Sequence, residues 1–247
     1  MAFCELHYFS DSLQKAISVD LILPEKKEGP FHTLYLLHGL SDDHTIWQRR
    51  TSIERYVQDL SLIVVMPDGG RGFYTDALEG MAWESSIVKD LVTYVDTMLP
   101  TIPSRKGRCV EGLSMGGYGA IKFALKHPDI FGSAVGHSGA VAWGHKPLLG
   151  DEPYTKEFRR IAGEHPEGGE NDLFALAKSC NQDLIPAIRF DCGTEDFLIE
   201  DNRVFHAYLE EIKFPHEYEE FHGTHEWGYW DVHVREGIEF HRRNLGF

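Results

Sequence analysis

A serine with a glycine two positions away on either side constrains this chain more than any other feature. The pentapeptide Gly-Leu-Ser-Met-Gly occupies residues 112–116, directly after the β-compatible residues 108–111. Residues 117–126 follow, and their pattern predicts a helix. A strand that turns sharply into a helix strains the backbone at the bend, and small neighbours let the chain segments pass closely. The pattern therefore predicts Ser114 as a nucleophile above a sheet edge; a plain glycine-rich turn is the alternative.

Strand and helix patterns alternate along the rest of the chain. Short apolar runs, typical of strands buried on both faces, lie at residues 33–37, 62–67, 132–136 and 187–192, with a further strand at 216–221. Helices are expected between and after them, near residues 52–60, 81–99, 201–213 and 229–244. Two early strands, 2–9 and 15–23, are expected to form an antiparallel edge. This alternation predicts an α/β fold, with a mostly parallel central sheet covered by helices on both faces.

The pattern weakens between residues 142 and 183, where glycine, proline and acidic residues interrupt short helical pieces. Long segments without regular structure are often functional in compact domains. We therefore expect one domain, residues 1–247, with a lid insertion at about 142–183 over the carboxyl ends of the strands. An irregular surface excursion is the alternative.

Length and charge limit the classes of partner. A chain of 247 residues is long enough to bury the core of one α/β domain. Its net charge of −15 disfavours nucleic acids and anionic membrane surfaces as partners. No apolar stretch approaches the roughly 20 residues of a membrane span, the N-terminus lacks a signal-peptide pattern, and the four cysteines form no C-x-x-C pair. A cytoplasmic protein is expected, and the oligomeric state, including a homo-oligomer, stays open.

A serine nucleophile needs a base and an acid, which in an open α/β sheet follow it on loops after later strands. Asp196 lies just beyond the strand that ends near Gly193, and we assign it as the acid; Asp191, Glu195 and Asp201 are its rivals. His225 lies past the Gly223 turn in the loop before the last helix, and we assign it as the base; His222 is its rival.

Two backbone amides are expected to form an oxyanion hole, which stabilises the negative charge of a tetrahedral intermediate. One is that of Met115, the residue after the serine. The other is that of Leu40, after the buried strand that ends in His38-Gly39. The alternative is that His38-Gly39 only turns the chain.

Aromatic residues gather near the predicted loops, and we expect Trp47, Trp143 and Trp227 to contact a substrate. Packing in the core or the lid is the alternative for each. His222, His225, His137 and His145 lack the H-E-x-x-H spacing of a helical zinc site. The sequence therefore predicts no metal and no cofactor.

Five motifs together resemble the esterase D family of α/β-hydrolases. They are Leu-Leu-His-Gly-Leu-Ser-Asp-Asp at 36–43, Val-Met-Pro-Asp-Gly at 65–69, Gly-Leu-Ser-Met-Gly-Gly-Tyr-Gly-Ala at 112–120, Gly-Thr-Glu-Asp-Phe-Leu at 193–198 and Gly-Thr-His-Glu-Trp at 223–227. The tributyrin and feruloyl (cinnamoyl) esterase branch is most similar in length and in the last motif. The resemblance implies a single α/β-hydrolase domain with Ser114, Asp196 and His225 as its catalytic triad.

The expected function is that of a serine carboxylesterase acting on a small-molecule ester through an acyl-enzyme. Acetyl and butyryl esters are the first choice of substrate, and hydroxycinnamoyl esters such as feruloyl esters the second. An S-formylglutathione hydrolase-like thioesterase and an acyltransferase of the same fold are the alternatives. A non-catalytic binding protein is the alternative of another class, because a fold alone does not establish activity.

Overall fold

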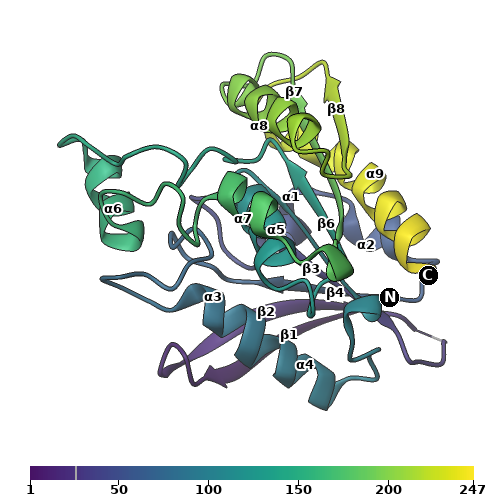
Figure 1. The fold of residues 1–247 in the computed structure, drawn as a ribbon. Helices are drawn as coiled ribbons and strands as arrows, with labels where there is room; N and C mark the ends of the chain where they lie inside the picture. Colours follow the sequence, from purple (N-terminus) through teal and green to yellow (C-terminus); the bar gives the residue numbers. More distant parts are fainter. Residues whose placement is uncertain (26) are drawn as a thin grey trace.

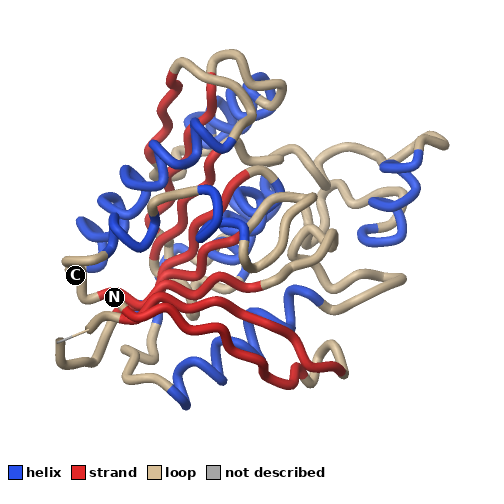
Figure 2. The backbone as a smooth tube through the Cα atoms, turned by 180° about the vertical axis from the view of Figure 1, so that it is seen from behind, coloured by secondary structure: helices blue, strands red, loops and turns tan. Residues whose placement is uncertain are grey.

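One twisted sheet of eight strands runs through the computed structural model, which describes residues 1–25 and 27–247 (Figures 1 and 2). In spatial order the strands are β1 (Ala2–Ser10), β2 (Lys15–Leu23), β4 (Leu62–Pro67), β3 (His32–Leu37), β5 (Arg108–Leu113), β6 (Ser133–His137), β7 (Ala187–Gly193) and β8 (Glu217–Phe221). The β1–β2 and β2–β4 pairs are antiparallel and the remaining pairs are parallel. The predicted α/β-hydrolase fold with an antiparallel edge is confirmed.

Helices cover both faces of this sheet (Figure 1). One face packs against α1 (Ile46–Arg50), α2 (Ile53–Val57) and α9 (Trp227–Leu245). The other packs against α3 (Trp83–Ser85), the π-helix η1 (Ser86–Leu91), α4 (Val92–Met98), α5 (Met115–Lys126), α7 (Leu173–Ser179) and α8 (Ile199–Glu211). Short 3-10 helices, η2 (Arg105–Gly107) and η3 (Gln182–Leu184), precede β5 and β7. Within the described residues, each helix is too short or too polar to cross a lipid bilayer.

The apolar runs of the central strands follow from this two-sided burial. Side chains alternate along a strand, so successive residues enter different cores. In β4, Val64 and Met66 pack with α2 and α9, whereas Ile63 and Val65 pack with the helices of the other face. A strand covered on both faces therefore needs an apolar residue at each position, and β4 is buried throughout.

The helices differ from expectation in the short α1, which was not expected, and in two longer stretches. The single helix expected at residues 81–99 is three successive segments, α3, η1 and α4, because a π-helical stretch at Ser86–Leu91 interrupts the α-helical pattern. Residues 142–183 contain α6 (Pro153–Ala162) as well as α7, so this stretch has more regular structure than its composition indicates. In Figure 1, α6 projects away from the sheet. Whether the segment moves as a lid stays a prediction.

A buried ionic cluster joins the three strands at the middle of the parallel sheet. His137 on β6 donates from Nε2 to Glu111 on β5 (2.8 Å) and from Nδ1 to Asp191 on β7 (2.9 Å), and all three side chains are fully buried. Burial lowers the pKa of His137, but the carboxylates of Asp191 and Glu111 outweigh burial and raise this pKa to about 10. His137 is therefore an imidazolium between two carboxylates whose own pKa values lie below their usual range.

We expect the free energy of unfolding to fall as the pH rises through neutrality. The pKa of His137 is about 10 in the folded chain, against its ordinary value of 6.5. Between about pH 6.5 and about pH 7.5, the unfolded chain loses this proton and the folded chain keeps it. The interval stops there because burial lowers the pKa of Lys122 to about 8, and loss of that proton from the folded chain opposes the slope. One proton corresponds to about 1 kcal/mol of lost stability per pH unit. Urea unfolding across this interval measures the slope, and a flat profile would contradict an ionised His137.

Candidate active site

Ser114 occupies a strained backbone conformation at the carboxyl end of β5. Its φ of 53° and ψ of −116° lie outside the regions that L-residues ordinarily adopt, and α5 begins at the next residue. Two backbone hydrogen bonds hold the bend: the Ser114 amide donates to the His137 carbonyl (2.9 Å), and the Ala140 amide donates to the Ser114 carbonyl (3.1 Å). The sharp strand-to-helix turn predicted from the pentapeptide is confirmed.

Gly116 is required by the close approach of β3 to the first turn of α5. A Cβ atom at this position would overlap the Leu37 carbonyl oxygen and would lie 2.7 Å from that of His38. Real Cβ atoms do not come this close to backbone oxygens, so any larger residue must push the two segments apart. The glycine after the serine thus keeps the loop that follows β3 against the nucleophile turn.

The structure brings Ser114, His225 and Asp196 together from three loops. His225 Nε2 lies 2.9 Å from Ser114 Oγ, and His225 Nδ1 lies 2.8 Å from Asp196 Oδ2. A carboxylate beside Nδ1 requires a proton on that nitrogen, which leaves the lone pair of Nε2 to accept the hydroxyl proton of the serine. This geometry is what general-base activation of a hydroxyl needs.

Asp196 is held in its ionised form. Burial raises the pKa of its carboxyl, but the hydrogen bond from His225 and the bond from the Leu198 amide (2.8 Å) outweigh burial and lower this pKa below its usual value. The hydroxyl of Ser138, which is fully buried, also lowers the pKa of this carboxyl. The side chain of Asp196 has no exposed surface, so its charge acts on His225 with little screening by water.

The rivals of Asp196 and His225 lie elsewhere. Asp191 is in β7 and belongs to the buried ionic cluster, where it also accepts from the Tyr229 hydroxyl (2.9 Å). His222 and Glu195 form an exposed pair with each other (3.1 Å). Asp201 lies in the first turn of α8 and pairs with Lys146 (3.4 Å). In the described chain, none of these rivals has a hydrogen bond to the serine.

Aromatic rings surround His225. Trp230 meets its imidazole edge-on, with ring centroids 4.9 Å apart. The ring of Phe197 is tilted against the same imidazole, with centroids 4.5 Å apart. Phe197 is 76% exposed although it is a large apolar residue. The sequence analysis did not single out Phe197. Its place directly after Asp196 in a loop was the feature from which a position near the site could have been predicted.

Trp47 is a correction to the expected substrate contacts. It is only 1% exposed, packs in the core beneath α9, and donates its indole N–H to the Leu37 carbonyl (3.0 Å). Trp227 is half-buried and packs edge-on against both Trp47 and Trp230. The physical reason is that the short helix α1, which was not expected, turns Trp47 inward to cover the sheet.

Trp143 follows the β6 loop that bonds to Ser114. Its ring stacks on Phe73 at 4.3 Å and meets Phe158 of α6 at 6.0 Å. It is 9% exposed, and its indole N–H has no hydrogen-bond partner among the described residues. Its role as a substrate contact stays a prediction.

The loop after β3 lies beside Ser114, where the predicted oxyanion donors are needed. A Cβ atom placed on Gly39 would lie 3.8 Å from the Cβ of Ser114. Across residues 1–25 and 27–247, the amides of Leu40 and Met115 donate no backbone hydrogen bond. Met115 is also the first residue of α5, where unpaired amides and the helix dipole favour negative charge. Both amides stay predictions as an oxyanion hole.

Helix α6 is tied to this loop by Arg71. The guanidinium of Arg71 forms two hydrogen bonds of 2.7 Å with the carboxylate of Glu157 on α6. The same side chain donates to the Leu40 carbonyl at 3.5 Å. Part of the segment 142–183 is thus connected to the residue expected to supply an oxyanion amide.

Comparison with known proteins assigns the family. The sequence model of the Esterase family matches residues 10–238. This chain belongs to the Esterase family. Membership confirms the resemblance to esterase D-like enzymes and the predicted class, a carboxylic ester hydrolase.

Three relatives are similar over nearly their whole length. An acetyl esterase from Caldicellulosiruptor saccharolyticus is 28% identical, over 97% of this chain and 98% of its own. The structure of FphF, a fluorophosphonate-binding serine hydrolase of Staphylococcus aureus, is 34% identical, with a TM-score of 0.87 over 97% of this chain and 98% of that one. A structure of S-formylglutathione hydrolase (FrmB) from S. aureus is 33% identical, with a TM-score of 0.85 and the same coverage.

We expect Gly116→Ala to lower the stability of this esterase and the rate at which a fluorophosphonate probe labels Ser114. The added methyl group must displace the Leu37 and His38 carbonyls, which costs on the order of 1–3 kcal/mol. Gly228→Ala is the matched control, because a Cβ at this helical position of α9 has its nearest neighbour at 4.0 Å. Urea unfolding and labelling kinetics test both; equal behaviour of the two variants would contradict the close approach.

Proposed function

We propose that this protein is a serine carboxylesterase that hydrolyses small acyl esters through an acyl-enzyme on Ser114. The observation that supports the proposal most directly is the continuous hydrogen-bonded chain from Ser114 Oγ through His225 to Asp196, with distances of 2.9 and 2.8 Å. It begins at a serine whose strained backbone holds the hydroxyl at the end of the strand.

In the proposed acylation, Ser114 Oγ attacks the ester carbonyl carbon while His225 Nε2 takes the hydroxyl proton. Asp196 keeps the imidazole oriented and stabilises the imidazolium that forms. The carbonyl oxygen becomes an oxyanion that accepts hydrogen bonds from the Leu40 and Met115 amides. The carbon–oxygen bond to the alcohol then breaks, and His225 returns the proton to the leaving alcohol.

Deacylation repeats the same proton transfers with water. His225 takes a proton from the water as its oxygen attacks the acyl carbon. When the intermediate collapses, the ester bond to Ser114 breaks, the serine regains its proton from His225, and the carboxylic acid is released. These steps require only the side chains and amides named here.

Short acyl groups are the proposed substrates, supported by the acetyl esterase of nearly equal length. A formyl thioester is the second candidate, because the S. aureus hydrolase named for S-formylglutathione is 33% identical. Both substrates present a small acyl group, so the leaving group distinguishes them. Hydroxycinnamoyl esters are a third choice that the same assay tests.

We expect Ser114→Ala to reduce hydrolysis of p-nitrophenyl acetate by at least ~10⁴-fold, because the variant has no nucleophile. Rates on the acetate, butyrate and octanoate esters, on methyl ferulate and on S-formylglutathione define the substrate class of the wild type. Faster cleavage of acetate and butyrate than of octanoate supports the proposal, and a dominant S-formylglutathione rate identifies the thioesterase. Unchanged turnover in Ser114→Ala would rule out this nucleophile.

Asp196→Asn is expected to lower kcat by ~10³–10⁴-fold, because an amide no longer selects the His225 tautomer that can accept the serine proton. Glu195→Gln is the matched control: its carboxyl is adjacent in sequence but pairs with the exposed His222 and accepts from the Gly223 amide (2.8 Å), a bond that a glutamine oxygen keeps. The control should stay within about 2-fold of wild type, as expected for a surface pair. Equal losses in both variants would contradict the assignment of Asp196.

A further inference from the structure

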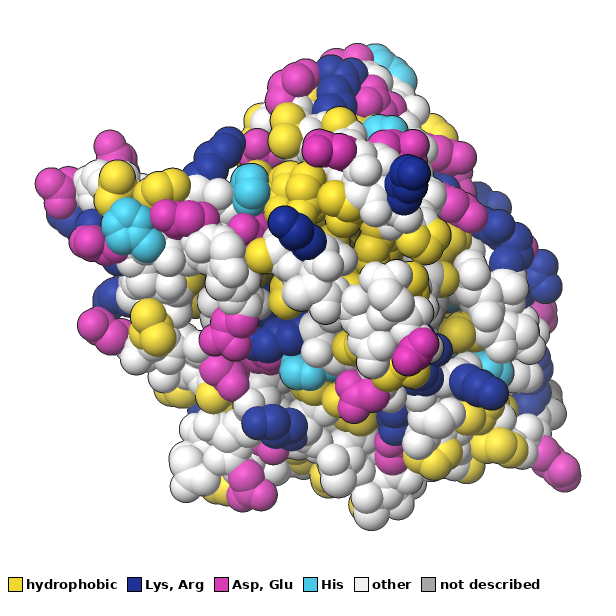
Figure 3. Space-filling view, in the orientation of Figure 1, with side chains coloured by type: hydrophobic (Ala, Val, Ile, Leu, Met, Phe, Trp, Pro, Cys, Tyr) yellow, Lys and Arg dark blue, Asp and Glu magenta, His cyan; other side chains and the backbone are white. Residues whose placement is uncertain are grey.

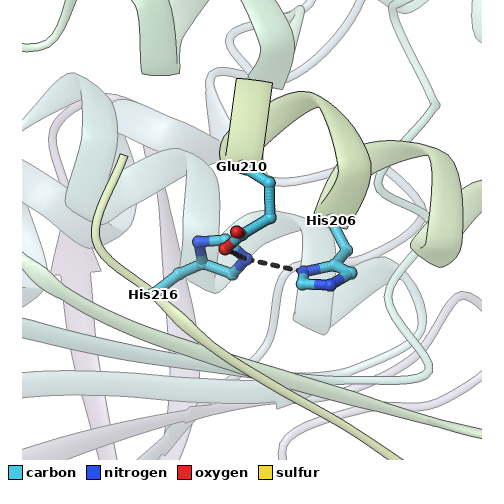
Figure 4. A group of neighbouring side chains, drawn as sticks. All are labelled: His206, Glu210 and His216. Atoms are coloured by element: carbon cyan, nitrogen blue, oxygen red, sulfur yellow. Dashed lines mark hydrogen bonds and ion pairs between the residues drawn. The ribbon is translucent and has the colours of Figure 1, made fainter. Parts of the chain in front are cut away.

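Three metal-ligating side chains meet at the end of the sheet away from Ser114 (Figure 4). His206 and Glu210 come from α8, and His216 lies directly before β8. One ligand atom from each lies within 4.8 Å of the others, and this is the one such group found among residues 1–25 and 27–247. We infer that His206, Glu210 and His216 form a binding site for a zinc-type transition-metal dication.

The two helical ligands lie four residues apart, so they project from the same face of α8. Figure 4 shows both side chains pointing toward His216. Histidine nitrogens with one carboxylate form a donor set that suits Zn²⁺, Ni²⁺ or Cu²⁺, whereas Mg²⁺ and Ca²⁺ prefer oxygen ligands. Three protein ligands leave a fourth tetrahedral position for water.

His216 is already oriented as a ligand. Its Nδ1 donates to the Phe214 carbonyl (2.8 Å), which keeps the lone pair on Nε2, the nitrogen that faces His206. Metal-bound histidines commonly have such a backbone partner on the second nitrogen. The His216 side chain is only 1% exposed and its ring lies parallel to that of Phe190, with centroids 5.7 Å apart. Its position is therefore set by the core and not by the ligand.

The distances need only small changes to hold an ion. His206 Nδ1 and His216 Nε2 are 2.8 Å apart and share a hydrogen bond, whereas two nitrogens on a tetrahedral zinc ion lie about 3.3 Å apart. The ion takes the place of the proton that lies between these two nitrogens. His206 stays neutral, because its ring proton moves from Nδ1 to Nε2. Glu210 Oε1 lies 3.9 Å from His216 Nε2, and its side chain is 68% exposed, so it can rotate inward.

The site would connect α8 to the start of β8. Its ligands are at the amino end of β8, while the loops with Asp196 and His225 follow the carboxyl ends of β7 and β8. The metal would therefore stabilise the edge of the fold and take no part in the acyl transfer. The spacing of the histidines in the sequence does not predict this group, because His216 meets α8 only after the chain has turned at Lys213.

Titration of the EDTA-treated protein with Zn²⁺ by calorimetry tests the site. Wild type is expected to bind one Zn²⁺ per chain at this site, and Mg²⁺ is expected to give no heat. His206→Gln and Glu210→Gln should each weaken zinc binding by at least ~10-fold. Because Zn²⁺ binds the folded chain, it should raise the Tm of wild type more than that of either variant. Glu210 is largely exposed, so its variant keeps the fold.

His165→Gln is the matched control, because His165 is exposed and pairs with Glu167 (2.9 Å) but, among the residues that the structure describes, belongs to no metal-ligating group. Zinc affinity of this control should equal that of wild type. Absence of zinc binding by wild type, or equal affinity in wild type, His206→Gln and Glu210→Gln, would overturn the inference.

Discussion

The ion cluster of Glu111, His137 and Asp191 is the constraint on which the centre of this molecule depends. It places one positive charge between two negative charges with no exposed surface, in three adjacent strands. Removing one member would leave a buried charge without its partner, which typically costs 3–5 kcal/mol. The cluster also fixes how β5, β6 and β7 are aligned, and each candidate active-site loop on these strands begins a few residues beyond it.

The cluster is connected to each of the loops that carry the candidate active site. Ser114 is three residues after Glu111, and its amide bonds to the carbonyl of His137 itself. Asp196 follows Asp191 by five residues, and Tyr229, which bonds Asp191, lies four residues after His225. Each candidate residue thus lies within five residues of a cluster member or of a residue bonded to one, an arrangement that favours the preorganised site that electrostatic catalysis requires.

Local patterns predicted much of this structure. Apolar runs placed the central strands, because burial on both faces leaves a strong signal, and the turn at Ser114 and the loops with Asp196 and His225 followed from chain order. Features that depend on contacts between distant elements were not visible. The inward turn of Trp47 depends on α1, a helix of five residues that is too short for a periodic signal. The meeting of His206 and His216 depends on how α8 packs against β8.

Arg71 has a consequence for how enzymes of this shape diversify. One guanidinium holds both Glu157 on α6 and the carbonyl of Leu40, so the covering segment and the loop after β3 share a support. A change of length or sequence around α6 would therefore alter the backbone position of Leu40 as well as the space above the serine. New substrate preferences acquired through that segment would come with altered rates on the old substrates, which restricts the order in which such changes can accumulate.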